Sequence, residues 1–120
     1  MKFLKLAMMF LAITAMTVSF AFADGDAEKG KALFNDPRLA EGTSGKSCNS
    51  CHPDGKGLLN APGKKRFKIM GKKIKSLEDA VNFWIKKGLR GKEMDLKSEE
   101  MSNLIAYIKS LKSDIHKEKQ

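Results

Sequence analysis

The sequence predicts an all-α fold of three or four short helices. Apolar residues recur at helical spacing in three segments, and no segment alternates apolar and polar residues over a length that would indicate a strand. Runs rich in glycine and proline separate these segments and are typical of loops. A domain of this size buries only about two thirds of the surface of its unfolded chain, so we expect its helices to wrap around a further group that adds to the core.

The first helix is predicted to begin after Asp26, which can accept hydrogen bonds from the free backbone amides of the first turn. It covers the sequence AEKGKALFN and ends before Pro37. Gly30 lies in its middle, where glycine costs about 1 kcal/mol relative to alanine. We therefore expect a packing reason for this glycine.

The second helix should begin after Ser76, because Ser76-Leu77-Glu78-Asp79 has the order of a capping box, with Asp79 in place of the usual Glu or Gln. It should run to about Lys87, with Gly88 as its stop signal. Ser98 should cap the last helix, whose apolar stripe is Met101, Leu104, Ile105, Ile108 and Leu111.

Residues 1–23 have the pattern of a secretory signal peptide. Lys2 and Lys5 precede a long apolar run that ends in Ala21-Phe22-Ala23, a sequence that signal peptidase accepts. We predict cleavage after Ala23, a periplasmic location, a folded domain over residues 24–112, and a charged, flexible tail over residues 113–120. The alternative is an uncleaved membrane anchor, because the run is close to the shortest membrane span. After cleavage no membrane span remains.

The formal net charge of +9 falls to +7 when the two lysines of the signal peptide are removed. A basic protein associates faster with an acidic partner surface or an anionic membrane face. The chain contains no recognisable nucleic-acid-binding motif, so we expect no nucleic-acid partner. We expect a monomer.

Both cysteines lie in the sequence Cys48-Asn49-Ser50-Cys51-His52, which fits the C-x-x-C-H attachment motif of c-type haem. In such a motif the two thiols form thioether bonds with the haem vinyl groups. The histidine that follows is then placed to bind the iron as proximal ligand. We predict one haem c, with its iron, per chain.

Two cysteines at this spacing have three other possible roles. A disulfide between Cys48 and Cys51 would leave His52 without a role. A thioredoxin-like dithiol requires a βαβ context, which the sequence lacks. Zinc requires four ligands, and only His116 in the predicted tail could supply the fourth. The signal peptide, the absence of other cysteines and the small helical domain favour haem.

Three methionines downstream of the motif could bind the other face of the iron, where a thioether raises the reduction potential. Met101 lies on the apolar stripe of the last helix and is better explained as core. Met70 lies in a strongly basic segment close to His52 in sequence. Met94 lies in a loop before a capped helix, so it is the predicted distal ligand. A site without a methionine ligand stays open as an alternative.

These segments resemble the small soluble bacterial class I (mono-haem) c-type cytochromes over nearly the whole chain after the signal peptide. The matching sequences are GKALF, CHPDGKGL, DLKSEE after Met94, and LIAYIKSL. The resemblance implies a cytochrome c-like fold around one haem, in which Leu104 and Tyr107 of the last helix meet Gly30 and Phe34 of the first. It also implies an electron carrier with His/Met ligation that exchanges electrons with other redox proteins and is not an enzyme.

The chain departs from this family in three places. A proline carbonyl usually holds the second nitrogen of the axial histidine, and we assign this role to Pro62, with Pro53 as the alternative. Asp95 follows Met94 where most members have proline. The segment between the first helix and Cys48 resembles that of bacterial di-haem cytochrome c peroxidases, although only one motif is present. The alternative function is therefore a mono-haem ligand-binding or weakly peroxidatic protein with an open sixth iron position.

Two further expectations concern side chains outside the motif. Trp84 should pack against the haem or the core, where its indole N–H could reach a haem propionate. The lysine clusters GKKRFK and GKKIK should face solvent, and they could dock an acidic redox partner.

Overall fold

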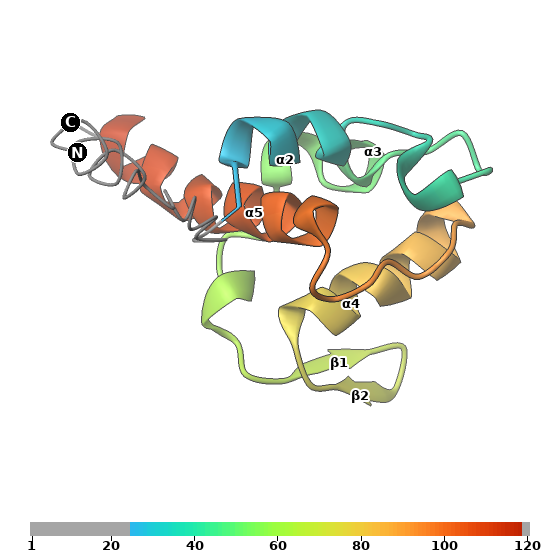
Figure 1. Ribbon diagram of the computed structural model, residues 1–120. Coiled ribbons are helices and arrows are strands. Elements are labelled where there is room, and N and C mark those ends of the chain that lie inside the picture. Colours follow the sequence, from blue (N-terminus) through green and yellow to red (C-terminus); the bar gives the residue numbers. More distant parts are fainter. Residues whose placement is uncertain (1–24, 119–120) are drawn as a thin grey trace, which may run out of the picture.

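The computed structural model describes residues 25–118, so the predicted signal peptide and its cleavage site lie outside the described residues. The α-helices in this range are α2 (Ala27–Phe34), α3 (Cys48–Cys51), α4 (Leu77–Trp84) and α5 (Glu99–Glu118) (Figure 1). Short 3₁₀ turns lie at Leu39–Glu41, Pro53–Gly55 and Ala61–Gly63, and a two-stranded sheet is formed by β1 (Phe67–Ile69) and β2 (Lys72–Ile74).

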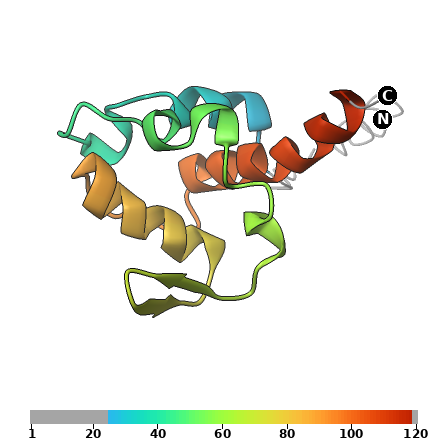
Figure 2. The same cartoon turned by 180° about the vertical axis from the view of Figure 1, so that it is seen from behind.

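The core is centred on the crossing of α2 and α5, which lie side by side in both ribbon views (Figures 1 and 2). A Cβ atom on Gly30 would lie 1.9 Å from the carbonyl oxygen of Asn103 and 2.8 Å from Cβ of Tyr107. The rings of Phe34 and Tyr107 pack edge to face, with centroids 5.1 Å apart. The expected packing reason for Gly30 is confirmed, although its nearest neighbour is Asn103, while Leu104 is buried in the same core.

The predicted helix starts are confirmed, but the capping box expected at Ser76 is not complete, because Asp79 accepts from Ser76 Oγ at 2.7 Å and not from the Ser76 backbone amide. Asp26, Ser76 and Ser98 each accept a hydrogen bond from a backbone amide of the following turn, at 2.9, 3.1 and 3.2 Å. These short polar side chains stabilise helix ends because they bind amides that have no partner within the helix.

Gly88 does not end the second helix, contrary to the prediction. The chain continues from α4 into a π-helical turn over Ile85–Leu89 and leaves it at Arg90, whose φ is +54°. Both Ile85 and Leu89 are buried in the core. The wider turn keeps these two apolar side chains on the inner face, and this packing outweighs the tendency of glycine to end a helix.

The all-α prediction is wrong in one respect, because β1 and β2 form an antiparallel hairpin at the lower edge of the molecule (Figure 1). Met70 and Gly71 form its two-residue turn, with φ values of +49° and +80°. Positive φ at both turn residues matches the right-handed twist of the flanking strands. Each strand has only three residues, which is too short for an alternating pattern to be recognised in the sequence.

Helix α5 continues to Glu118 and therefore includes residues that were assigned to a flexible tail. Residues 113–118 contain neither glycine nor proline, so nothing in the sequence stops the helix at 112. Within residues 25–118, no helix is long and apolar enough to cross a membrane.

Candidate haem site

The two cysteines lie at the two ends of α3, which is a single helical turn. Ser47 precedes this turn and forms a capping box with Ser50, in which the Ser47 backbone amide donates to Ser50 Oγ at 3.0 Å. Both thiols are free, Cys48 half-buried and Cys51 exposed. The capped turn thus presents two thiols from one short, fixed piece of backbone.

Burial raises the pKa of the Cys48 thiol to about 11, while a backbone hydrogen bond opposes this shift. A reactive redox cysteine usually has a lowered pKa, because the thiolate is the nucleophile. Cys48 instead has the properties of a small neutral group against the core. This environment gives no support to a thioredoxin-like dithiol.

The imidazole of His52 is oriented by the backbone that follows it. Its Nδ1 lies 3.0 Å from the carbonyl oxygen of Lys56. A carbonyl oxygen can only accept, so Nδ1 carries the proton and the lone pair of Nε2 is left for another partner. The assignment of this role to Pro62 or Pro53 was therefore wrong. The chain turns back after His52 through Gly55, whose φ is +77°, and this turn brings the Lys56 carbonyl to the ring.

Half-buried apolar side chains on α2, α3 and α4 and in the segments before and after α3 pack against the core. They are Leu33, Ala40, Cys48, Leu58, Leu59, Leu77 and Val81. A haem is a large, flat and mostly apolar group, so side chains that are apolar but only half-buried provide suitable contacts for it. Within the described residues, no group of three His, Cys, Asp or Glu side chains is arranged to hold a metal ion. The two free thiols of α3 and these half-buried apolar side chains fit a covalently attached haem.

The three candidate methionines lie in different environments. Met70 is 73% exposed at the tip of the β1–β2 turn, whereas Met101 is fully buried in the core of α5. Met94 is buried at the edge of the core, in the irregular segment between the π turn and α5. Its position combines an apolar environment with a backbone that is free of helical constraints.

Asn82 was missed by the sequence analysis. It lies on α4 with an exposed fraction of only 6%. Its Nδ2 donates to the Met94 carbonyl at 2.8 Å, and its Oδ1 accepts from the Met94 amide at 2.9 Å. The only signal in the sequence was an asparagine inside a helix, where asparagine is unfavourable unless its side chain has another partner.

Trp84 does not pack into the core. Its side chain is 46% exposed and contacts Phe83 edge to face, with ring centroids 5.3 Å apart. It lies at the last position of α4, and its expected contact with a haem propionate stays a prediction.

A family model described as SoxA/TsdA, cytochrome c domain, matches residues 29–116. The matched range begins within α2, includes α3, α4 and the hairpin, and ends near the end of α5. Searches of curated proteins and of solved structures gave no significant match. Cytochrome c domains bind haem c covalently and serve as redox components, which agrees with the fit of the C-x-x-C-H segment to a haem. The chain therefore belongs to the SoxA/TsdA cytochrome c domain family and is a small c-type cytochrome with a single C-x-x-C-H motif.

Proposed function

We propose that this cytochrome is a periplasmic electron carrier and not an enzyme, with one haem c attached through Cys48 and Cys51. His52 is the proximal ligand of the iron and Met94 the distal ligand. The observation that carries the proposal is the hydrogen bond between His52 Nδ1 and the Lys56 carbonyl. It leaves Nε2 free, directly after a turn that presents two thiols, in a chain that belongs to a cytochrome c family.

When bound, haem c accepts and releases one electron at its iron. The Lys56 carbonyl fixes the tautomer and the ring orientation of His52 and increases the basicity of Nε2, as partners of ligating histidines usually do. The thioether of Met94 is a soft, uncharged ligand that raises the reduction potential and occupies the position at which outside ligands would bind. Methionine ligation by Met94 would thus favour electron exchange over ligand binding.

The surroundings of the three methionines support Met94 over the other two. Met70 lies at an exposed turn with its side chain largely in solvent, and Met101 is enclosed by the α2–α5 core. The backbone of Met94 is hydrogen-bonded to the buried side chain of Asn82, and Met94 lies between α4 and α5 in the sequence. A ligand needs such a defined position, because a freely moving thioether would exchange with water.

The charge distribution supports redox partners with acidic docking surfaces. Residues 24–120 hold 21 basic and 14 acidic residues, and residues 55–77 contain eight of the basic residues and none of the acidic ones. The remainder of this range is close to neutral. The eight cations are all exposed: Lys56, Lys64, Lys65, Arg66, Lys68, Lys72, Lys73 and Lys75. We call this set the cationic hairpin face.

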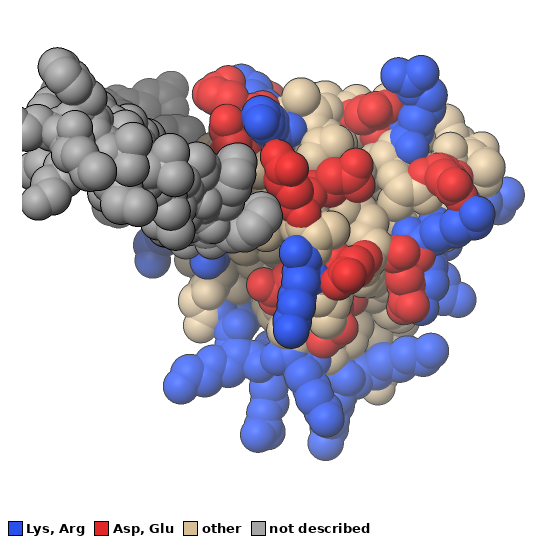
Figure 3. All heavy atoms as spheres, in the orientation of Figure 1, with Lys and Arg blue, Asp and Glu red and all other residues tan. Residues whose placement is uncertain are grey.

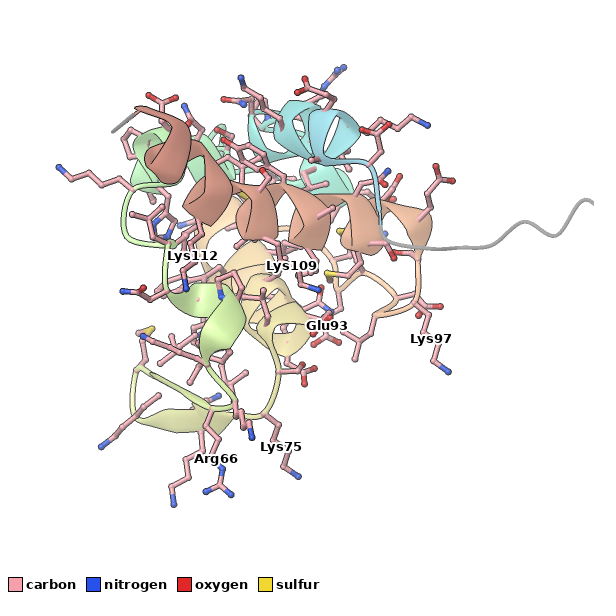
Figure 4. All side chains as sticks on the ribbon, turned by 90° about the vertical axis from the view of Figure 1, so that its left-hand side faces the viewer. Arg66, Lys75, Glu93, Lys97, Lys109 and Lys112 are labelled. Atoms are coloured by element: carbon pink, nitrogen blue, oxygen red, sulfur yellow. The ribbon has the colours of Figure 1, made fainter. Side chains whose placement is uncertain are left out.

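Among the described residues, no acidic side chain forms an ion pair with the cationic hairpin face. The four ion pairs found among the described residues all involve cations outside it. Lys68 even lies opposite Lys73 in the strand register, a like-charge pair that destabilises a hairpin. Lys and Arg side chains cover the lower edge of the molecule (Figure 3), and Arg66 and Lys75 project away from it (Figure 4). Such a face increases the rate of encounter with an acidic protein.

The first experiment tests haem, ligation and export together. The protein exported to a bacterial periplasm should have an intact mass that lacks residues 1–23 and includes one haem. Its colour should survive acid extraction, and its reduced form should not bind carbon monoxide rapidly. Met94→Ala should open the sixth position and lower the potential, whereas Met70→Ala should change neither. Rapid binding of carbon monoxide to the unmodified protein would favour the ligand-binding alternative over the carrier.

The second experiment tests the docking face. Electron exchange with the anionic complex hexacyanoferrate should slow as salt is added, because salt screens charges beyond about 10 Å at 0.1 M. The double variant Lys72→Glu, Lys73→Glu should slow the exchange and flatten its salt dependence. Lys31→Glu, Lys46→Glu makes the same change in charge at two exposed lysines outside the face. Equal effects of both double variants would show that only net charge matters and that the face has no special role.

A further inference from the structure

The segment that carries Met94 has almost no regular backbone pairing. Residues 91–95 belong to no helix or strand. The amide of Lys92 donates to the carbonyl of Ala40 at 2.8 Å, and the carbonyl of Asp95 accepts from the Ser98 amide at 3.0 Å. Between these two points, the amide and the carbonyl of Met94 depend on a side chain. A buried backbone group without a partner would be costly, so this side chain is important for the segment.

That side chain is Asn82, which binds both backbone groups of Met94. Its side-chain amide donates to the Met94 carbonyl through Nδ2 and accepts from the Met94 amide through Oδ1. The backbone of a neighbouring strand would supply the same two hydrogen bonds. Because Asn82 is on a regular helix, its Cα position is fixed by α4. The two hydrogen bonds therefore fix both the distance and the rotation of the Met94 backbone relative to α4.

We infer that Asn82 is a positioning residue that holds the backbone of Met94 so that its thioether stays on the iron. The inference rests on the proposed ligation by Met94 and adds to it the reason why that ligand is not displaced. Asn82 itself does not touch the haem iron in this role. Without it, the segment between Lys92 and Asp95 would have no backbone partner at its centre, and Met94 would exchange more readily with outside ligands.

A structural role alone would also make Asn82 important, so a matched control is needed. Asn103 has the same exposed fraction, 6%, and its Oδ1 accepts from a backbone amide, that of Asp26, at 2.8 Å. It lies at the α2–α5 crossing rather than beside Met94. Asn82→Leu and Asn103→Leu thus make the same chemical change at two equally buried sites, and both should lower the stability of the fold.

The experiment measures displacement of methionine from the oxidised holoprotein by imidazole, together with the charge-transfer band of methionine-ligated ferric haem. Asn82→Leu should increase the apparent imidazole affinity by about tenfold or more, because two buried hydrogen bonds no longer hold Met94. Asn82→Asp keeps the acceptor for the Met94 amide but loses the donor to its carbonyl, so it should show an intermediate increase. Asn103→Leu should leave the affinity and the band unchanged.

The inference is overturned if Asn82→Leu and Asn103→Leu change imidazole affinity equally, or if neither changes it. The parent ligation is tested separately by Met94→Ala. If that variant keeps the band and the affinity of the unmodified protein, Met94 is not the ligand, and the proposed ligation and this inference both fail. If it loses the band while Asn82→Leu does not change the affinity, the ligation stands and the role of Asn82 alone is refuted.

Discussion

Replacing Gly30 with alanine tests the helix crossing on which the fold depends. The new Cβ atom would lie 1.9 Å from the Asn103 carbonyl oxygen, and ordinary contact begins at 3.4 Å, so α2 and α5 must move apart by about 1.5 Å. Such overpacking costs about 1 to 3 kcal/mol. The edge-to-face contact of Phe34 and Tyr107, worth about 0.5 to 1.5 kcal/mol, would weaken as the helices separate.

Alanine also favours a helix interior over glycine by about 1 kcal/mol, which offsets part of this loss. We therefore expect Gly30→Ala to lower the free energy of unfolding by about 1 to 3 kcal/mol. The measurement is denaturant unfolding of the holoprotein, followed by far-ultraviolet circular dichroism. The control is Gly88→Ala, since a Cβ atom on Gly88 would have no neighbour within 4 Å. The control should be neutral or stabilising. If Gly30→Ala were as stable as the unmodified protein, the close crossing would not be a constraint.

Three further experiments test the local chemistry. Ser76→Ala removes the cap that binds the Asp79 amide and should cost about 1 kcal/mol in the same unfolding assay, so an unchanged midpoint would contradict the cap. Gly71→Val places a β-branched residue at a φ of +80° and should disorder the hairpin. Amide hydrogen exchange in β1 and β2 should then be faster, and an unchanged exchange rate would exclude this turn. In haem-free protein, iodoacetamide should alkylate Cys48 more slowly than the exposed Cys51 at neutral pH, because a raised pKa keeps its thiol protonated. The rate at Cys48, followed by mass spectrometry, should rise as the pH approaches 11, and equal rates at neutral pH would contradict its burial.

The helix starts could be predicted from the sequence because each depends on one residue and the amides next to it. Asp26, Ser76 and Ser98 act within three residues along the chain, so their effect is local. Gly30 could be interpreted only with the resemblance to cytochromes c, because its partner is on a helix more than 70 residues away. The prediction named the correct helix but not Asn103, whose backbone atoms are the nearest contact.

The parts that could not be predicted depend on tertiary packing. Gly88 is a strong local stop signal, yet the burial of Ile85 and Leu89 extends the helix through it as a π turn. The hairpin has strands of three residues, so its pattern is no longer than one turn of a helix. The clearest sign of the hairpin in the sequence is Gly71 at its turn. The residue before it, Met70, also has a positive φ, and such a φ is uncommon for methionine.

The two faces of the proposed haem site differ in how far apart their residues lie along the chain, and this difference has a functional consequence. Cys48, Cys51, His52 and the Lys56 carbonyl fall within nine residues, so the proximal side is specified by one short segment. The distal side that we propose depends on Asn82 and Met94, which are brought together where α4 packs against the segment before α5. Substitutions in either element can change that distance without disturbing haem attachment. The distal side is therefore where a protein of this design can be converted from a closed carrier into a ligand-binding one.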